Sequence, residues 1–195
     1  MEQEIKIKIE NPLELISKLI VLKAEKIGQS FQRTTRMDTP NMDLEKNGTF
    51  LRVRSGHKNS VTLKKKLKEK NKEIFEREEI ETEVKDIDKL ADIFSNLGFT
   101  KRLILEKYRI DFKYKDLNIS IDELPFGFYV ELEGKSERIF EIAKELSLDV
   151  ANKITVTYWD LFEEYKKKNN LQGEDIIFPE DYDYKSKLLV KGQIV

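Results

Sequence analysis

The segment MEQEIKIKIE (1–10) carries a charge at every even position from Glu2 to Glu10 and isoleucine at positions 5, 7 and 9. Successive side chains of a β-strand point to opposite faces, so this alternation predicts a strand with one apolar face and one charged face. The charged face holds both carboxylates and ammonium groups. It either faces water or lines a site whose ligands need both kinds of charge.

The same alternation recurs in seven further segments, which are FQRTTRMD (31–38), FLRVR (50–54), VTLKKKL (61–67), REEIETEV (77–84), KYRIDFKY (107–114), NISID (118–122) and YVELE (129–133). Turn signals such as Asn47-Gly48 and Ser55-Gly56 separate them, and the polar stretch KEKNK (68–72) is typical of a hairpin tip. Eight short strands at this spacing predict an all-β sandwich or barrel.

Four segments have apolar residues at helical spacing, at 12–20, 87–97, 139–146 and 158–165. The charged face of any single strand is ordinarily solvated. Helical stripes, however, need an apolar sheet surface to cover. We therefore expect a mainly β (α+β) fold, an eight-stranded antiparallel β-barrel tunnel with helices packed on its outside and a charged interior.

Length and composition limit the domain organisation, the partners and the kinds of site that are possible. A length of 195 residues suggests one domain. From the strands and helices above, we expect the barrel to span 1–168 and to leave a C-terminal extension of unknown role over 169–195. Lys+Arg 36 against Asp+Glu 37 leaves a net charge of −1, which does not favour a nucleic-acid partner. There is no cysteine, so disulfides and thiolate metal sites are excluded. A charged N-terminus and the lack of a long apolar run predict a cytoplasmic protein with no membrane partner.

The charges of the alternating segments are segregated by type. Cations occupy three strands (Arg52 with Arg54, Lys64 with Lys66, Lys107 with Arg109), and carboxylates occupy others (Glu2 with Glu4, Glu131 with Glu133, and Asp122). A charged interior is too unfavourable unless it is wet and filled by ligands of both signs. Carboxylates suit Mg²⁺ or Mn²⁺, and Arg and Lys suit phosphate oxygens. A polyphosphate bound with a metal satisfies both.

The chain also resembles a known family, the CYTH superfamily or triphosphate tunnel metalloenzymes. Glu2-x-Glu4-x-Lys6 is similar to its E-x-E-x-K signature, although Glu81-x-Glu83-x-Lys85 and Glu131-x-Glu133-x-Lys135 fit that pattern too. The ordered series is more specific, and its members are MDTPNMDLEKNGTFLRVR (37–54), VTLKKK (61–66), EREEIE (76–81), EKYRIDF (106–112), ISIDELPFGFYVELEG (119–134) and TYWDLF (157–162). Met37 stands where the family often has an aromatic residue, and the family's functional residue on a C-terminal helix has no evident counterpart.

The resemblance implies roles for the matching positions. Divalent metal would be bound by Glu2, Glu4, Glu131 and Glu133, with Asp122 assisting. The triphosphate would be bound by Lys6, Arg52, Arg54, Lys64 and Arg109, with Lys66 and Lys107 as further contacts. Lys6, Glu79 and Glu81 are the candidates for catalysis.

Three functions stay open. The first is a Mg²⁺- or Mn²⁺-dependent hydrolase of inorganic triphosphate, of ATP or another nucleoside triphosphate, or of thiamine triphosphate. The second is a class IV adenylyl cyclase that forms cyclic AMP and pyrophosphate from ATP, and the third is a non-enzymatic polyphosphate or nucleotide sensor. A homodimer is an open alternative for the assembly. Trp159 and Phe162 are expected to be packing residues of the last helix, although Trp159 could instead cover an opening of the tunnel.

Overall fold

The structure is a computed structural model that describes residues 2–66, 75–180 and 182, without the side chains of Glu2, Phe75 and Glu76. The hairpin tip expected at 68–72 and most of the tail beyond 180 lie outside these residues. The described strands are β1 (Glu2–Ile9), β2 (Glu25–Asp38), β3 (Thr49–Ser55), β4 (Ser60–Lys66), β5 (Phe75–Glu83), β6 (Lys101–Tyr114), β7 (Leu117–Leu124) and β8 (Gly127–Glu133).

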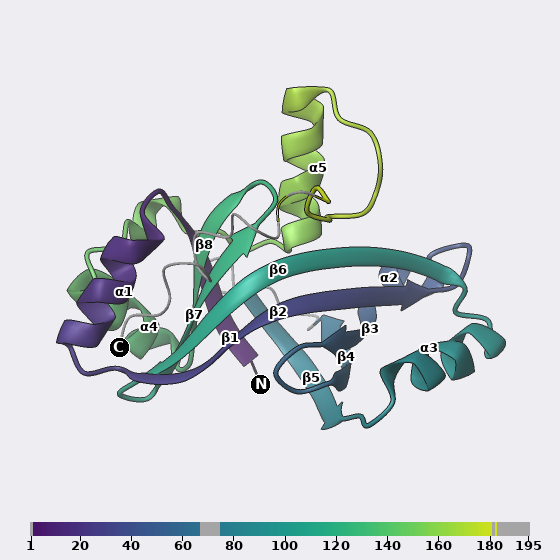
Figure 1. The fold of residues 1–195 in the computed structure, drawn as a ribbon, viewed down its shortest axis with the longest axis horizontal. Helices are drawn as coiled ribbons and strands as arrows, with labels where there is room; N and C mark the ends of the chain where they lie inside the picture. Colours follow the sequence, from purple (N-terminus) through teal and green to yellow (C-terminus); the bar gives the residue numbers. More distant parts are fainter. Residues whose placement is uncertain (1, 67–74, 181, 183–195) are drawn as a thin grey trace.

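All pairs of neighbouring strands are antiparallel, and their order is β1-β5-β4-β3-β2-β6-β7-β8. The order closes on itself because β1 pairs with both β5 and β8. The predicted eight-stranded antiparallel fold is confirmed. Two strands are longer than predicted, because β2 and β6 pair from Glu25 opposite Lys113 to Asp38 opposite Lys101 and lie side by side across the molecule (Figure 1).

The described helices are α1 (Pro12–Val21), α2 (Asp43–Lys46), α3 (Ile87–Asn96), α4 (Ser136–Glu145), α5 (Tyr158–Asn169) and the 3-10 turn η1 (Val150–Asn152). The four predicted helices are present, and the one-turn helix α2 was missed. The start of α5 is fixed by a capping box, in which Thr157 and Asp160 satisfy each other's backbone N–H groups.

Apolar strand faces point outward and are covered by helices. α1 and α4 pack over β1 and β6–β8 (Figure 1), where Ile5, Leu19 and Ile139 are fully buried. α3 covers β2 and β3 through Ala91, and α5 packs Phe162 against Phe126 and Leu105. Since strand side chains alternate, the polar faces of the same strands must point into the barrel.

Two exposed strand edges are sealed by segments that follow α4. In the part of the chain that the structure describes, β1 pairs with β5 through three residue pairs, and farther along β1 the backbone of Lys6 bonds both ways to Ile154. β6 pairs with β7 only from Tyr108 onward, and Ile176 bonds to Ile104 and Glu106 before that point. Because unpaired strand edges invite aggregation, we expect the backbone bonds of Ile154 and Ile176 to protect these edges.

None of the helices in the described residues is long and apolar enough to cross a membrane.

This sealing role gives a stability prediction. Ile176 is fully buried against Leu105 and α5, whereas its neighbour Ile177 is 49% exposed. We expect Ile176→Ala to lower the free energy of unfolding by about 2–4 kcal/mol, because it leaves a cavity under the segment. Ile177→Ala should change it by less than about 0.5 kcal/mol. Urea unfolding of both variants checks this, and equal effects would contradict the sealing role.

Candidate functional site: a charged tunnel

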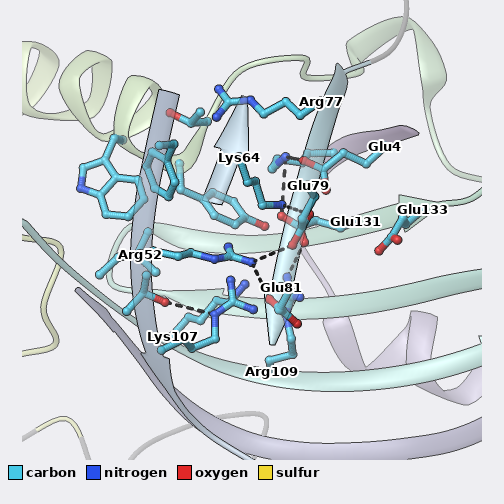
Figure 2. A pocket seen from close by; sticks show the side chains of 18 residues that line it. Glu4, Arg52, Lys64, Arg77, Glu79, Glu81, Lys107, Arg109, Glu131 and Glu133 are labelled. Carbon is cyan, nitrogen blue, oxygen red and sulfur yellow. Dashed lines mark hydrogen bonds and ion pairs between the residues drawn. The ribbon is translucent and has the colours of Figure 1, made fainter. Parts of the chain in front are cut away.

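A cavity of about 300 Å³ lies inside the barrel (Figure 2). Among the described residues, seven cationic side chains line it, from Lys6, Arg52, Arg54, Lys64, Arg77, Lys107 and Arg109. Five carboxylates share the same walls, from Glu4, Glu79, Glu81, Glu131 and Glu133. Aromatic and hydroxyl side chains complete the lining, including those of Phe50, Tyr158 and Trp159.

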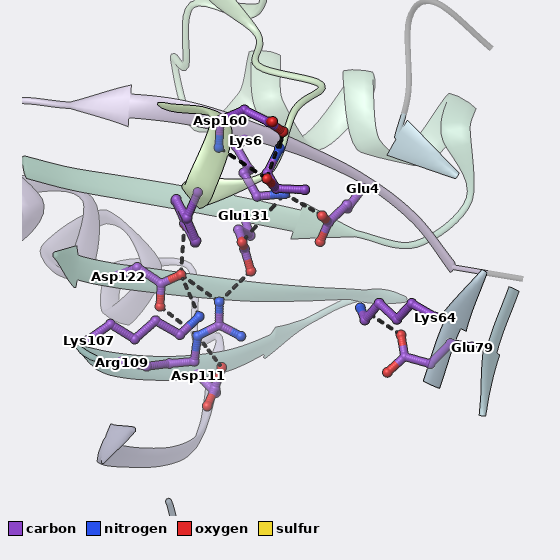
Figure 3. Close-up of polar contacts among 12 residues, drawn as sticks. Glu4, Lys6, Lys64, Glu79, Lys107, Arg109, Asp111, Asp122, Glu131 and Asp160 are labelled. Atoms are coloured by element: carbon purple, nitrogen blue, oxygen red, sulfur yellow. Dashed lines mark hydrogen bonds and ion pairs between the residues drawn. The ribbon is translucent and has the colours of Figure 1, made fainter. Parts of the chain in front are cut away.

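One wall is made by β1 and β8, which set Glu4 opposite Glu133 and Lys6 opposite Glu131. The Lys6 ammonium group is buried and donates to the Glu4 carboxylate, and it lies 3.6 Å from Glu131 (Figure 3). Glu131 also accepts a hydrogen bond from Arg109. This wall therefore alternates carboxylates and cations in direct contact.

Asp122 on β7 lies behind this wall and is fully buried. Its carboxylate accepts hydrogen bonds from the Arg109 guanidinium at 2.6 and 2.5 Å, from Lys107 Nζ at 3.0 Å and from the Tyr158 hydroxyl at 2.8 Å. Tyr158 is the first residue of α5, so this carboxylate joins the helix to two tunnel cations. It fixes the direction in which both cations point.

A second ion-pair group lies on β3, β4 and β5, apart from the first (Figure 3). Lys64 lies 2.8 Å from Glu79, and Arg52 lies 3.6 Å from Glu79 and 3.5 Å from Glu81. The Thr62 hydroxyl donates to Glu81 at 2.6 Å and accepts from Arg52 at 3.1 Å. These contacts hold the cations and carboxylates of this wall within one network.

Arg54 differs from its neighbours. It donates to the Thr34 hydroxyl at 3.3 Å, and no carboxylate of the described residues forms an ion pair with it. Burial, followed by the positive charges of Arg52 and Arg109, lowers the pKa of Arg54 from 12.5 to about 9. A desolvated cation beside other cations is a strong attractor for an anion.

Lys107 has a similar environment. Burial, followed by the positive charge of Arg109, lowers the pKa of Lys107 from 10.5 to about 7, although Asp122 and Glu131 favour the charged form. Burial opposes ionisation of Glu131, but Arg109 and Lys6 outweigh it and hold the Glu131 pKa well below its ordinary value. The carboxylate is therefore ionised at neutral pH, whereas Lys107 is poised between its two states.

The structure places the predicted site residues as follows. Eleven of the fourteen line the cavity, which are Glu4, Lys6, Arg52, Arg54, Lys64, Glu79, Glu81, Lys107, Arg109, Glu131 and Glu133. Asp122 lies behind the wall, and Lys66 lines a second, smaller cavity at one end. Glu2 begins β1, and its side chain lies outside the described residues. The roles assigned to all fourteen stay predictions.

Sequence reasoning gave no site role to several residues of the cavity wall. Arg77 and Phe50 each precede a predicted site residue by two positions on the same strand, so strand alternation could have identified them. Tyr158 and Trp159 reach the tunnel because α5 lies over one end of the barrel, and no local pattern indicates that placement. Phe162 is a packing residue as expected. Trp159 packs against the same apolar cluster, also as expected, and in addition lines the cavity.

Three carboxylates of the tunnel wall have the chemistry that the implied Mg²⁺ or Mn²⁺ prefers. Glu4, Glu131 and Glu133 supply oxygen ligands on adjacent strands, which suit Mg²⁺ or Mn²⁺. Across residues 2–66 and 75–180, however, no three His, Cys, Asp or Glu side chains are gathered as a metal cluster. Glu4 and Glu131 instead contact Lys6 and Arg109. These three carboxylates have the right ligand chemistry for Mg²⁺ or Mn²⁺, and they can bind it once the ion pairs with Lys6 and Arg109 open.

Comparison with known proteins gives consistent results. The family model of the CYTH domain matches residues 1–158. A curated protein of Methanocaldococcus jannaschii named "Putative adenylate cyclase" is 30% identical over 173 residues, which cover 83% of this chain and 98% of the relative. A solved structure of a conserved hypothetical protein from Pyrococcus furiosus is 27% identical with a TM-score of 0.70, covering 83% of this chain and 99% of that one.

A Hippeastrum structure shares the fold with a TM-score of 0.63, at 18% identity and with coverage of 91% of this chain and all 100% of that one. It is described as an adenylyl cyclase candidate with a dominant triphosphatase activity. The family match covers most of the chain, in agreement with the motifs and the tunnel. This protein belongs to the CYTH domain family.

Proposed function

We propose that this protein is a divalent-metal-dependent enzyme that binds a triphosphate in its tunnel and hydrolyses the terminal phosphoanhydride bond. The observation that carries the proposal is the excess of buried positive charge, in which Arg54 is desolvated beside Arg52 and Arg109 with no carboxylate of its own among the described residues. A phosphate chain supplies several oxygens to such a cluster, and Arg binds them bidentately.

The remaining cations become available by exchange. In the free protein, carboxylates of the tunnel wall form ion pairs with four of these cations, Lys6, Arg52, Lys64 and Arg109. Phosphate oxygens can replace those carboxylates, and this frees Glu4, Glu131 and Glu133 to hold Mg²⁺ or Mn²⁺. The triphosphate and the metal are therefore expected to bind together, because each compensates the charges that the other releases.

The hydrolysis requires positioning and charge neutralisation more than covalent chemistry. A water oxygen attacks the terminal phosphorus, the phosphoanhydride P–O bond breaks, and the leaving phosphate oxygen carries away the electron pair. When bound, the metal polarises the phosphoryl oxygens. Arg52 and Arg54 neutralise the phosphate charge. Glu79 or Glu81 accepts the proton of the attacking water, or Lys6 does so in its neutral amine form.

A class IV adenylyl cyclase is the second candidate, and the name of the M. jannaschii relative favours it. In that reaction the ribose 3′-oxygen attacks the α-phosphorus of ATP and pyrophosphate leaves. The same cations suit both reactions, and the difference is which nucleophile is held in line with which phosphorus.

The two reactions are distinguished by their products. The purified chain is incubated with Mg²⁺ or Mn²⁺ and with inorganic triphosphate, ATP, GTP or thiamine triphosphate, and phosphate and cyclic AMP are measured in the same samples. The proposal expects phosphate release that stops on metal removal. Cyclic AMP with matching pyrophosphate would establish the cyclase instead. Binding without any product would establish the sensor.

The excess of cations in the tunnel predicts that loss of Arg54 weakens triphosphate binding. Arg54→Ala should weaken binding of a non-hydrolysable triphosphate analogue by about 10- to 100-fold, because a charge-assisted phosphate contact is removed. Arg102→Ala, which removes a half-exposed arginine outside the tunnel, should leave binding unchanged. Titration calorimetry measures both, and equal affinities for the two variants would contradict the role of Arg54.

The lowered pKa of Lys107 predicts that triphosphate binding depends on pH. In the free protein its pKa of about 7 leaves it neutral at higher pH, so binding of an anion there must first charge it. Affinity of the wild type relative to Lys107→Arg should fall by up to about tenfold per unit of pH above 7, since arginine stays charged throughout. Titration of the ligand affects both proteins equally, so it cancels in the ratio of the wild-type affinity to the Lys107→Arg affinity. If this ratio is constant from pH 6 to 9, the role of Lys107 is contradicted.

A further inference from the structure

A second cavity of about 200 Å³ adjoins one end of the tunnel, and Phe50, Arg77, Thr157 and Trp159 line both. We call this second cavity the annex. A ligand whose phosphates lie in the tunnel can therefore extend past these four residues into the annex. Inorganic triphosphate has no group to place there, whereas an organic triphosphate does.

The aromatic corner of the annex wall fits a flat ring. The rings of Phe50 and Trp159 lie 5.3 Å apart and are inclined at 59°, so their faces form an apolar corner at the entrance. The indole Nε1 of Trp159 is buried, so the indole offers a ligand in the annex its ring surface and no accessible donor.

The charges of the annex select among rings. Its cations are Arg36, Lys66 and Arg77, and the Arg36 guanidinium already lies 5.0 Å from the centre of the Phe50 ring. Its carboxylates are engaged, because Glu45 pairs with Arg36 and Asp160 caps α5. The described lining holds three cations against two carboxylates, and this charge excess favours a neutral ring over a cationic one. The attraction of a cation to the faces of Phe50 and Trp159 offsets part of that preference.

We propose that the annex binds the base of a nucleoside triphosphate, with Phe50 and Trp159 as stacking surfaces. This rests on the proposed function, and it names nucleoside triphosphates, rather than inorganic or thiamine triphosphate, as the class that the site prefers. Thiamine carries a cationic ring, which the annex disfavours. Trp159 is then a specificity residue, and it makes no contribution to binding of the phosphate chain.

Trp159 is the one tryptophan of the chain, so its fluorescence reports on the annex directly. With Mg²⁺ present, β,γ-imido-ATP should change the emission of the wild type, and inorganic triphosphate should leave it nearly constant. By calorimetry, Trp159→Leu should weaken β,γ-imido-ATP binding by about 5- to 100-fold, the range expected for loss of one stacked base. The same variant should bind inorganic triphosphate within about twofold of the wild type, because the tunnel cations are intact.

Trp159→Phe serves as the conservative variant. It keeps a stacking ring of smaller area, so its affinity for β,γ-imido-ATP should lie between those of the wild type and Trp159→Leu. Thermal unfolding of each variant controls for loss of fold. Thiamine triphosphate should bind the wild type more weakly than β,γ-imido-ATP does.

The outcomes separate the two proposals. If the wild type binds inorganic triphosphate but Trp159→Leu weakens both ligands equally or neither, the annex proposal is overturned and the tunnel proposal stands. If the wild type binds neither ligand, both are overturned.

Discussion

The constraint on which the rest of the structure depends is the placement of many ionised groups inside a protein. An ion taken out of water loses several kcal/mol of solvation unless opposite charges and hydrogen bonds replace that solvation. The tunnel meets this requirement with ion-pair networks, in which Glu131 contacts Lys6 and Arg109, and Glu79 contacts Lys64 and Arg52. The charge compensation is incomplete at Arg54, which has no ion pair with a carboxylate of the described residues, and the proposed anion site rests on this imbalance.

The charged interior also determines the outside of the barrel. With polar faces inward, the apolar faces must be covered, and α1, α4, α3 and α5 do this. α5 has a second task, because the Tyr158 hydroxyl donates to Asp122, which in turn holds Lys107 and Arg109. Packing of a helix on the barrel is thus coupled to the direction of two tunnel cations. The segment around Ile176 seals the strand edge beside them.

Much of this arrangement could be predicted because strand alternation is a local property. Once the helices required the apolar faces outward, residues such as Arg52 and Glu131 were assigned to the interior by position alone. Non-local features could not be predicted in this way. The depth of Asp122, the place of Trp159 at the annex and the return of Ile176 to β6 depend on how α5 and the following chain pack on the barrel. The extension of β2 and β6 was missed because EKIGQS (25–30) and KRLILE (101–106) do not alternate cleanly.

The central claim is that triphosphate and divalent metal bind together because each releases the tunnel charges that the other needs. The most direct test is the affinity for Mn²⁺, measured by electron paramagnetic resonance with and without a non-hydrolysable triphosphate analogue. Because Glu4 and Glu131 contact Lys6 and Arg109 in the free protein, the account predicts weak Mn²⁺ binding alone and at least tenfold tighter binding with the analogue, beyond what the analogue itself chelates. Glu133→Gln should remove that increase. An affinity for Mn²⁺ that is unchanged by the analogue would contradict the exchange of ion pairs on which the account rests.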